Sequence, residues 1–158
     1  MSDVITFTIP GRLRGKGRPR ATVRGGFVKT YTDEKTRPCE GLVRHFASQA
    51  MGGAKPFDGP IALSVLIYLN TPASWPKKRK AAAYHATGKP DADNVLKLIG
   101  DSCNAIVWRD DSQISDIRMK RRYTDDQERV EIVVTALTRP AAIARAAIEK
   151  TKAARGEV

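Results

Sequence analysis

The sequence predicts a single-domain α+β protein with a mixed β-sheet and helices packed on it. Its 158 residues are the usual size of one domain, and 41% of them are hydrophobic, so a substantial core can form. Apolar residues alternate with others at 4–9, 113–123 and 129–137, which indicates strands, and recur every three or four residues at 33–49 and 91–106, which indicates helices. We assign residues 1–138 to this domain and residues 139–158 to a C-terminal helical basic tail.

The clearest strand is predicted at residues 61–70. One face of it is wholly apolar and the other is fairly apolar too, so we expect it at the centre of the sheet. The wholly apolar face carries Ile61, Leu63, Val65, Ile67 and Leu69. A short strand is also expected at 27–31. The strands at 113–123 and 129–137 are separated by a polar turn, so we expect them to pair as a hairpin.

Two amphipathic helices are predicted to cover the sheet. Thr32 can cap the first, at 33–49, which has acids in its first turn. The core-facing residues are expected to be Leu42, Val43, Phe46 and Ala50 in the first helix, and Val95, Leu96, Ile99, Cys103 and Ile106 in the second. A short helix and a loop are expected within 72–90. An alanine-rich helix is expected from Pro140 to about residue 155.

The composition restricts the class and the setting of the protein. The longest apolar stretch, at 61–69, is far shorter than the roughly 20 residues of a membrane span. The first residues show no secretory signal, so we expect a cytoplasmic protein. Cys39 and Cys103 are 64 residues apart, with no partner at metal-ligand spacing. We expect both to be reduced packing residues.

The net charge of +11 makes nucleic acid the leading partner class, because an excess of Lys and Arg raises the affinity for phosphate backbones. The competing interpretation is that the basic residues only solvate the surface. Residues 91–116 nevertheless hold six acids and two bases, against eleven acids and 26 bases in the rest of the chain. Such an acidic island suits a metal centre inside a phosphate-binding face.

Two basic segments are candidates for DNA contact. The first, within 12–24, is rich in glycine and proline, and we expect a loop that lays its cations along a phosphate backbone. The second is the run at 77–80, beside Trp75, whose ring is suited to packing on a sugar or a base. A mobile loop and a solvated face are the plainer alternatives. The candidate DNA-binding residues are Lys16, Arg18, Arg20, Lys77, Lys78, Arg79 and Lys89.

The segments KPDADNVLK and WRDDSQ hold the residues best suited to catalysis. Asp91 and Asp93 flank one residue at a helix start, and Asp111 follows the same helix. If these carboxylates converge, hard oxygen ligands without Cys or His favour Mg²⁺ or Mn²⁺ over zinc, and phosphoryl chemistry follows. Lys97 is the candidate for stabilising charge on the phosphate oxygens. A straight helix of roughly sixteen residues is about 24 Å long, so Asp111 reaches Asp91 only if the chain folds back or the helix is shorter.

The same residues have plainer structural interpretations. Asp91 can cap the helix, Asp93 and Lys97 can form an ordinary pair four residues apart, and Asp110 and Asp111 can belong to a solvated turn. The spacing of the residues alone does not decide between catalysis and these structural roles.

These motifs resemble the RusA family of Holliday junction resolvases, most of all its phage and prophage branch. The resemblance rests on KGRPR at 16–20, on KPDADN at 89–94 with Lys97 and Asp101, and on DDSQ at 110–113, and it covers roughly residues 4–137. It implies that the catalytic, metal-binding carboxylates are Asp91, Asp93 and Asp111, with Lys97 as an essential lysine. Asp110 remains an alternative to Asp111 as the third ligand, and we favour Asp111.

The resemblance further implies a homodimeric, Mg²⁺-dependent endonuclease that cuts two opposed strands of a four-way DNA junction in the cytoplasm of a bacterial or phage-infected cell. Mn²⁺ is expected to substitute for Mg²⁺. The family's dimeric fold is expected to bring the acids together. The rival hypothesis is a module that binds branched or duplex DNA without cutting it. The metal distinguishes the two, because uncompensated carboxylates turned towards phosphate lower the affinity for DNA.

Overall fold

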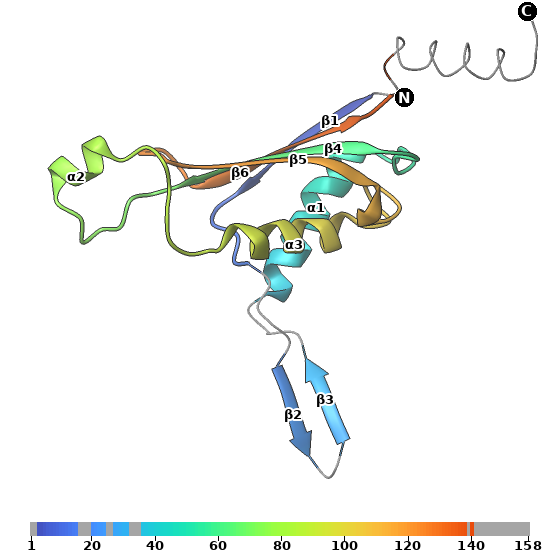
Figure 1. Ribbon diagram of the computed structural model, residues 1–158, viewed down its shortest axis with the longest axis horizontal. Coiled ribbons are helices and arrows are strands. Elements are labelled where there is room, and N and C mark those ends of the chain that lie inside the picture. Colours follow the sequence, from blue (N-terminus) through green and yellow to red (C-terminus); the bar gives the residue numbers. More distant parts are fainter. Residues whose placement is uncertain (1–2, 16–19, 25–26, 32–35, 139, 141–158) are drawn as a thin grey trace, which may run out of the picture.

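The computed structural model describes residues 3–15, 20–24, 27–31, 36–138 and 140 (Figure 1). A four-stranded mixed sheet has the order β1-β6-β4-β5. Its strands are β1 (Val4–Pro10), β4 (Ile61–Leu69), β5 (Ile114–Tyr123) and β6 (Arg129–Ala136). The helices α1 (Arg37–Met51) and α3 (Ala92–Cys103) lie on the same side of the sheet in Figure 1. This arrangement confirms the predicted single α+β domain with a mixed sheet and packed helices.

Strand β4 lies at the centre of the sheet, as predicted. It pairs parallel with β5 and antiparallel with β6, and β6 pairs antiparallel with β1. The five residues predicted for its apolar face are at most 2% exposed, so this face is the middle of the hydrophobic core. The edges of the sheet are therefore β1 and β5.

The predicted hairpin of the last two strands is wrong, because β4 lies between β5 and β6. The polar turn after β5 crosses the end of β4 instead of reversing beside it. Asn70 holds the crossing, since its side-chain amide donates hydrogen bonds of 2.8 Å to the carbonyl oxygens of Thr124 and Asp126. A hairpin would leave the most apolar strand at an edge with unpaired backbone groups, and the central position avoids that cost.

Helix α1 begins at Arg37, with Pro38 in its first turn. Proline suits this place because its missing N–H would have no partner inside the helix. Residues 33–35, where the helix was expected to begin, lie outside the described residues. Of the residues predicted to face the core, Val43 is buried, as expected. Leu42 is 36% exposed, so its prediction is wrong: the buried face of the helix runs through Val43, Ala47 and Met51. The buried residues of α1 are Val43, Ala47 and Met51, and Phe46 and Ala50 pack partly against the core.

Helix α3 ends at Cys103, earlier than the predicted end at 106. The chain leaves it at Asn104, and Ala105 has a positive φ of 62°. Asn104 Oδ1 accepts a 2.8 Å hydrogen bond from the indole N–H of Trp108, which is completely buried. The chain therefore turns back beside α3. The buried residues of α3 include Val95, Ile99 and Cys103, as predicted, and also Leu98, whereas Leu96 and Ile106 are partly buried.

The basic N-terminal segment is not wholly a loop. Residues 20–24 form β2 (Arg20–Arg24), which pairs antiparallel with β3 (Phe27–Tyr31) in a separate two-stranded sheet. The loop prediction is wrong there, because Thr22 and Val23 favour extended backbone and β3 supplies a partner. Strand β3 and the short helix α2 (Lys77–Ala82) confirm the predictions for these regions. The predicted C-terminal helix lies outside the described residues, apart from Pro140.

Two predictions from composition can be compared with the structure. Both cysteines are free, Cys103 in the core and Cys39 partly buried, in agreement with a packing role. Burial raises the pKa of the Cys103 thiol to about 12. Of the described helices, none is long and apolar enough to cross a membrane.

We expect Ser102→Ala to leave the free energy of unfolding unchanged or to raise it by about 1 kcal/mol. Ser102 is 1% exposed, and its Oγ has no hydrogen-bond partner among the described residues. A buried hydroxyl without a partner is destabilising, and alanine is the better helix former. Urea unfolding of both proteins measures the difference. A clear loss of stability would show that this hydroxyl is hydrogen bonded in solution.

Candidate active site

Asp91 occupies the N-cap position of α3 with an exposed carboxylate. Its backbone carbonyl accepts a 3.2 Å hydrogen bond from the N–H of Val95. Its side chain makes no capping hydrogen bond and instead accepts a 3.5 Å hydrogen bond from Asn94 Nδ2. The structural alternative is therefore right that Asp91 is the N-cap residue, but its side chain makes no capping hydrogen bond to the helix backbone. The carboxylate retains lone pairs for a ligand.

The turn before Asp91 is held by Arg121 of β5. One guanidinium nitrogen, Nη1, donates to the carbonyl oxygens of Gly88 and Pro90, each at 2.8 Å. Arg121 stands opposite Ile67 in the register of the sheet, so its side chain leaves on the face that the helices cover. The edge strand thereby positions the first residue of α3.

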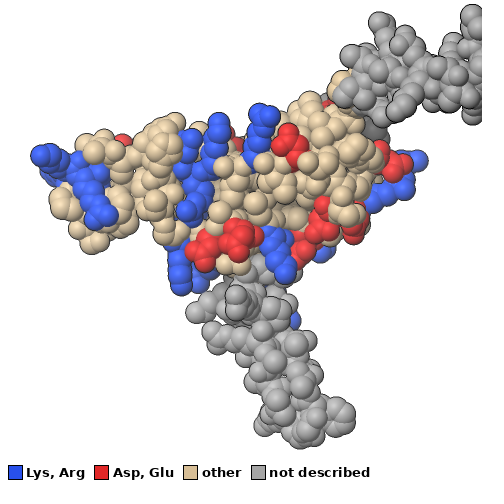
Figure 2. Space-filling model, viewed as in Figure 1, with Lys and Arg blue, Asp and Glu red and all other residues tan. Residues whose placement is uncertain are grey.

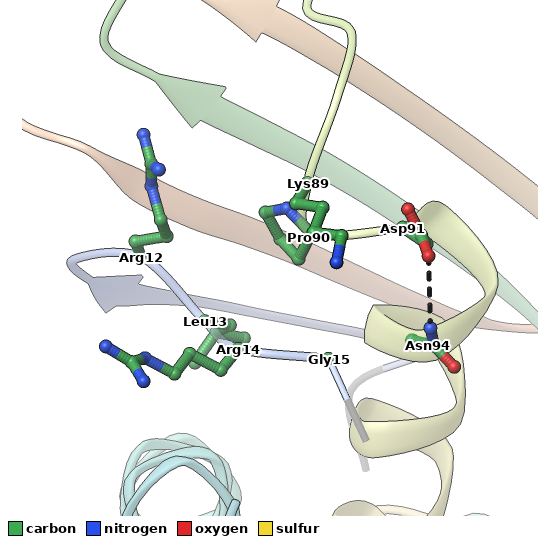
Figure 3. Close-up of a pocket in the computed structure, with 8 residues that line it drawn as sticks. All are labelled: Arg12, Leu13, Arg14, Gly15, Lys89, Pro90, Asp91 and Asn94. Carbon is green, nitrogen blue, oxygen red and sulfur yellow. Dashed lines mark hydrogen bonds between the residues drawn. The ribbon is translucent and has the colours of Figure 1, made fainter. Parts of the chain in front are cut away.

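A pocket of about 420 Å³ lies between residues 12–15 and the start of α3 (Figure 3). Figure 3 shows the two segments facing each other, with Arg12 and Arg14 on one side and Lys89 and Asp91 on the other. The peptide bond between Lys89 and Pro90 is cis. A carboxylate beside several cations suits a phosphate group that arrives with a bound metal ion.

Gly15 allows these two segments to approach each other closely. A Cβ atom at this position would lie 2.5 Å from Asn94 Cβ and 3.2 Å from the Asn94 carbonyl carbon. Leu13, which is 2% exposed, anchors the same segment in the core. The N-terminal segment is thus fixed against the start of α3.

Glu128 orients Arg12 at the edge of this pocket. Glu128 Oε1 accepts hydrogen bonds from Arg12 Nη2 at 2.6 Å and Nε at 3.2 Å, and from the backbone N–H of Asn70 at 2.9 Å. Partial burial raises the pKa of Glu128, but the hydrogen bonds from Arg12 and Asn70 outweigh it and hold this pKa below its ordinary value. The carboxylate therefore stays ionised at neutral pH.

Asp93 and Lys97 lie on one face of α3, and Asp111, from the turn after the helix, lies beside Gly100 further along it. Asp93 and Lys97 are exposed and one helical turn apart, yet neither forms an ion pair with any residue that the structure describes. The alternative of an ordinary pair between them is wrong. Gly100 lies two turns after Asp93, and a Cβ there would lie 3.9 Å from Asp111 Oδ2. Lys97 is consequently between two carboxylates.

The acidic turn gives its two carboxylates different roles. Asp110 caps the 3-10 helix η1 (Asp111–Gln113), because its Oδ1 accepts a 3.0 Å hydrogen bond from the N–H of Ser112. Hydrogen bonds from Ser112 lower the pKa of Asp110. Gln113 Oε1 accepts from the N–H of Asp110 at 3.0 Å, and Gln113 Nε2 donates to the carbonyl of Gly59 at 2.8 Å. No hydrogen bond engages the exposed Asp111 carboxylate within the described part of the chain.

The three candidate carboxylates do not converge within one chain. Gly100, the neighbour of Asp111, is nine residues after Asp91, which corresponds to about 13.5 Å along the helix. Among the described residues, no three His, Cys, Asp or Glu side chains lie close enough together to hold one metal ion. The chemistry of the donor set nevertheless fits Mg²⁺ or Mn²⁺, because all three candidates are exposed carboxylates, which supply hard oxygen ligands.

The predicted DNA-binding residues lie in two described places. Lys89 lines the pocket, whereas α2 carries its cations at one end of the molecule, on the left of Figure 2. The exposed cations of that helix are Lys77, Lys78 and Arg79. Lys16, Arg18 and the side chain of Arg20 lie outside the described residues. Figure 2 also shows acidic side chains gathered between basic ones on the face that it presents.

Sequence reasoning missed two residues that position this site. The capping role of Asp110 with Gln113 had a signal, the D-x-x-Q spacing of a capping box, which was not used for this turn. No sequence pattern indicates the role of Arg121. It is one of several basic residues in β5, and a basic residue in a strand is normally expected only to be exposed. Only the tertiary fold shows that it reaches the turn at 88–90.

Comparison with known proteins identifies the class. Residues 10–135 match the family described as endodeoxyribonuclease RusA, a range that includes the pocket, α3 and the acidic turn. A protein of Bacillus subtilis (strain 168), named uncharacterized protein YqaN, is 33% identical over 138 residues, which cover 84% of this chain and 96% of that relative.

The protein is therefore a nuclease of the endodeoxyribonuclease class, which cuts within DNA strands. The chain belongs to the RusA family, whose members act on DNA junctions, and the resemblance carried by the motifs at 16–20, 89–97 and 110–113 is confirmed.

We expect Gly15→Ala to weaken DNA binding, because the added Cβ forces the segment with Arg12 and Arg14 away from Asn94. Gly41→Ala in α1 is the matched control: a Cβ there meets nothing within 4 Å, so DNA affinity should be kept and the stability of the helix should rise by about 0.5 to 1 kcal/mol. Fluorescence anisotropy with labelled DNA measures the affinities. Equal affinities of the two variants would show that the close approach at Gly15 is unnecessary for binding.

The ion pair of Glu128 should make stability depend on pH. Because the folded-state pKa of Glu128 lies below its ordinary value of 4.5, its contribution is complete above pH 4.5 and is lost as the pH falls through the folded-state value. We expect the difference in unfolding free energy between the wild type and Glu128→Gln to be constant from pH 7 to about 5 and to shrink below this range. Urea unfolding at several pH values measures it. A difference that grows on acidification would contradict this assignment.

Proposed function

We propose that this protein is a homodimeric, Mg²⁺-dependent endonuclease that resolves four-way DNA junctions by paired, symmetric incisions. One observation carries the proposal. The carboxylate of Asp91, which helix capping does not engage, is exposed in a pocket that Arg12, Arg14 and Lys89 also line. A candidate metal ligand beside cations that suit phosphate is the combination that phosphodiester hydrolysis requires. Membership of the endodeoxyribonuclease family supports it.

Asp91, Asp93 and Asp111 would hold Mg²⁺, for which Mn²⁺ could substitute. When bound, the ion would supply an activated water and charge neutralisation at the leaving oxygen. Asp111 is favoured over Asp110, because Asp110 already accepts the hydrogen bond that caps η1. The carboxylate of Asp111 accepts no hydrogen bond from the described residues and so has no comparable structural role in the turn.

Lys97 would stabilise the negative charge that develops on the phosphate oxygens. It is exposed on the same face of α3 as Asp93, and no acid among the described residues neutralises it. An ammonium group near the reacting phosphate would stabilise this charge electrostatically.

Arg12, Arg14 and Lys89 would bind the backbone of the strand that is cut. Glu128 holds the guanidinium of Arg12, and Leu13 and Gly15 fix the segment that carries both arginines. The scissile phosphate would then lie between this segment and Asp91, where proximity and orientation lower the barrier. The basic residues of α2 would contact another part of the junction.

A homodimer suits both the substrate and the ligand set. A four-way junction presents two equivalent strands, and a two-fold symmetric dimer carries one active centre for each. The separation along α3 between Asp91 and the neighbour of Asp111 is about 13.5 Å in one chain. A second copy of the chain is the simplest source of a third carboxylate at each centre.

The rival function is a module that binds branched or duplex DNA without cleavage. Asp91, Asp93 and Asp111 argue against it, because their exposed carboxylates form no ion pair with the described residues, and uncompensated negative charge at a phosphate-binding face lowers affinity. Incubation with an end-labelled synthetic four-way junction, with and without Mg²⁺, distinguishes the two. Paired symmetric cuts that require the ion support the endonuclease, and binding without cuts supports the module.

We expect Asp91→Asn, Asp93→Asn and Asp111→Asn each to abolish cleavage while junction binding stays the same or becomes tighter. Each change removes a metal ligand and a negative charge and keeps the basic contacts. Asp125→Asn, in the exposed turn after β5, is the matched control and should cleave normally. Gel analysis of junction products and of complexes gives both quantities. Normal cleavage by any of the three would remove that residue from the site.

Lys97→Ala should lose cleavage at every Mg²⁺ concentration, because it removes charge stabilisation and no metal ligand. Lys55→Ala, which removes an exposed lysine from the loop after α1, should behave as the wild type. Single-turnover rates over a Mg²⁺ titration measure both variants. Recovery of the normal rate at saturating Mg²⁺ would limit Lys97 to a structural role.

A further inference from the structure

A second basic surface lies on the sheet face opposite to the helices. Arg118, Lys120 and Arg122 are two residues apart in β5, so their side chains leave on one face. In the register with β4, Arg118 is opposite Ser64 and Arg122 is opposite Tyr68, which are not on the buried face of β4. None of these three cations lines the pocket around Asp91.

Two of these cations are available to an anionic partner. The side chain of Arg118 is 77% exposed, and its nearest atom lies 3.9 Å from the carboxylate of Asp116. An ion pair this long and exposed holds Arg118 only weakly, so Arg118 can bind another anion. Lys120 is exposed and is in no ion pair with another described residue. Alternate residues of a strand are about 6.6 Å apart. That separation is of the order of the spacing between successive phosphates in an extended single strand.

Tyr84 stands at one end of this stripe and is 61% exposed. Its backbone is fixed at the edge of the sheet, because its carbonyl accepts a 2.8 Å hydrogen bond from the N–H of Tyr123, and the N–H of Ala86 donates to the carbonyl of Arg121 at 3.2 Å. The guanidinium of Arg122 lies 4.8 Å from the centre of the Tyr84 ring. An aromatic ring on a fixed backbone, exposed beside cations, is suited to stacking with a base.

Trp75 does not offer a comparable ring. The guanidinium of Arg79 lies 3.7 Å from the centre of its ring, and Tyr123 meets it edge to face at 5.5 Å. Trp75 is only partly exposed, so its ring stabilises the α2 region. Tyr84 has contacts of the same kind, with Arg122 and, edge to face at 5.0 Å, with His85. Because 61% of Tyr84 is nevertheless exposed, it is the more accessible of the two aromatic residues.

We propose that β5 and Tyr84 bind an unpaired, extended DNA strand, in which a base stacks on Tyr84 and the phosphates meet Arg118 and Lys120. Stacking on aromatic rings combined with phosphate neutralisation is the usual mode of single-strand binding. The inference rests on the DNA-binding part of the proposed function and is independent of its cleavage chemistry. The inference adds that the face formed by β5 and Tyr84 selects an unpaired DNA segment, in or beside the junction.

The first test compares Tyr84→Ala with Tyr84→Phe, with EDTA present to prevent cleavage. The probes are a labelled single-stranded oligonucleotide and a fully paired duplex of the same length, measured by anisotropy. Tyr84→Ala should weaken single-strand binding by at least about fivefold, equivalent to about 1 kcal/mol of stacking, and leave duplex binding unchanged. Tyr84→Phe should bind as the wild type, because the ring is retained. Leu42→Ala removes an exposed apolar side chain on α1 and is the control.

The second test uses the double variant Arg118→Gln/Lys120→Gln. The salt dependence of single-strand binding should become shallower by about 1.4 logarithmic units per tenfold change in salt, which corresponds to two lost phosphate contacts. Lys55→Gln removes one exposed charge elsewhere and should leave the slope unchanged. An unchanged slope in the double variant, or an equal loss on single strand and duplex in Tyr84→Ala, would overturn the proposal.

Sedimentation of the same variants identifies a different occupant of this face. If Tyr84→Ala or the double variant changes the oligomeric state and not the affinity for DNA, the face is a protein interface and the proposal is wrong. The outcome for Asp91→Asn is separate: if that variant cleaves normally, the proposed catalytic site fails while the single-strand surface can still pass its own tests.

Discussion

The central position of β4, between β5 and β6, is the constraint on which the rest of the structure depends. Because β5 pairs with β4, Arg121 leaves on the helix-covered face and holds the turn before Asp91. Because the chain then crosses the end of β4 to begin β6, Glu128 reaches Arg12 and Asn70. The pocket around Asp91 is thus assembled at one end of the sheet from segments more than a hundred residues apart in the chain, whereas Asp111 lies near the start of β5, at the other end of that strand.

The chain has a net charge of +11, so the surroundings of its acidic residues depend on where the fold places the basic ones. Asp91 lies beside Arg12, Arg14 and Lys89, so the pocket combines one carboxylate with three cations, and the proposed function places the metal ion and the phosphate there. The basic stripe of β5 leaves on the opposite face of the sheet from Arg121, and α2 carries its cations at one end of the molecule. Exposed charges separated by more than about 8 Å are largely screened at physiological salt, so each surface can act on its own part of a branched DNA.

Local patterns predicted what depends on local physics. The alternation in β4 and the apolar spacing in α3 identified both elements, and the D-x-D-N-x-x-K and D-D-x-Q motifs indicated the family. The pairing of β5 with β6 was predicted wrongly, because a polar turn between two strands is typical of a hairpin. That β4 pairs with a strand on each side depends on the whole sheet, and no local sequence pattern indicates it. The positions of Arg121 and Tyr84 follow from that pairing, so the sequence alone contained no signal for either of them.

The rigidity of the two acidic segments bears on how a metal centre could be completed. Two oxygens that share one Mg²⁺ are at most about 4 Å apart, whereas Asp91 and the neighbour of Asp111 are separated by about 13.5 Å along α3. The buried face of α3 fixes the helix, and the hydrogen bonds of Gln113 to Asp110 and Gly59 fix the turn. Since moving either segment would break a packed core or a closed network of hydrogen bonds, a third ligand from a second copy costs less than a rearrangement of one chain. In the homodimer that we propose, such an active centre would exist only in the dimer, and an isolated subunit would be kept from making unpaired cuts.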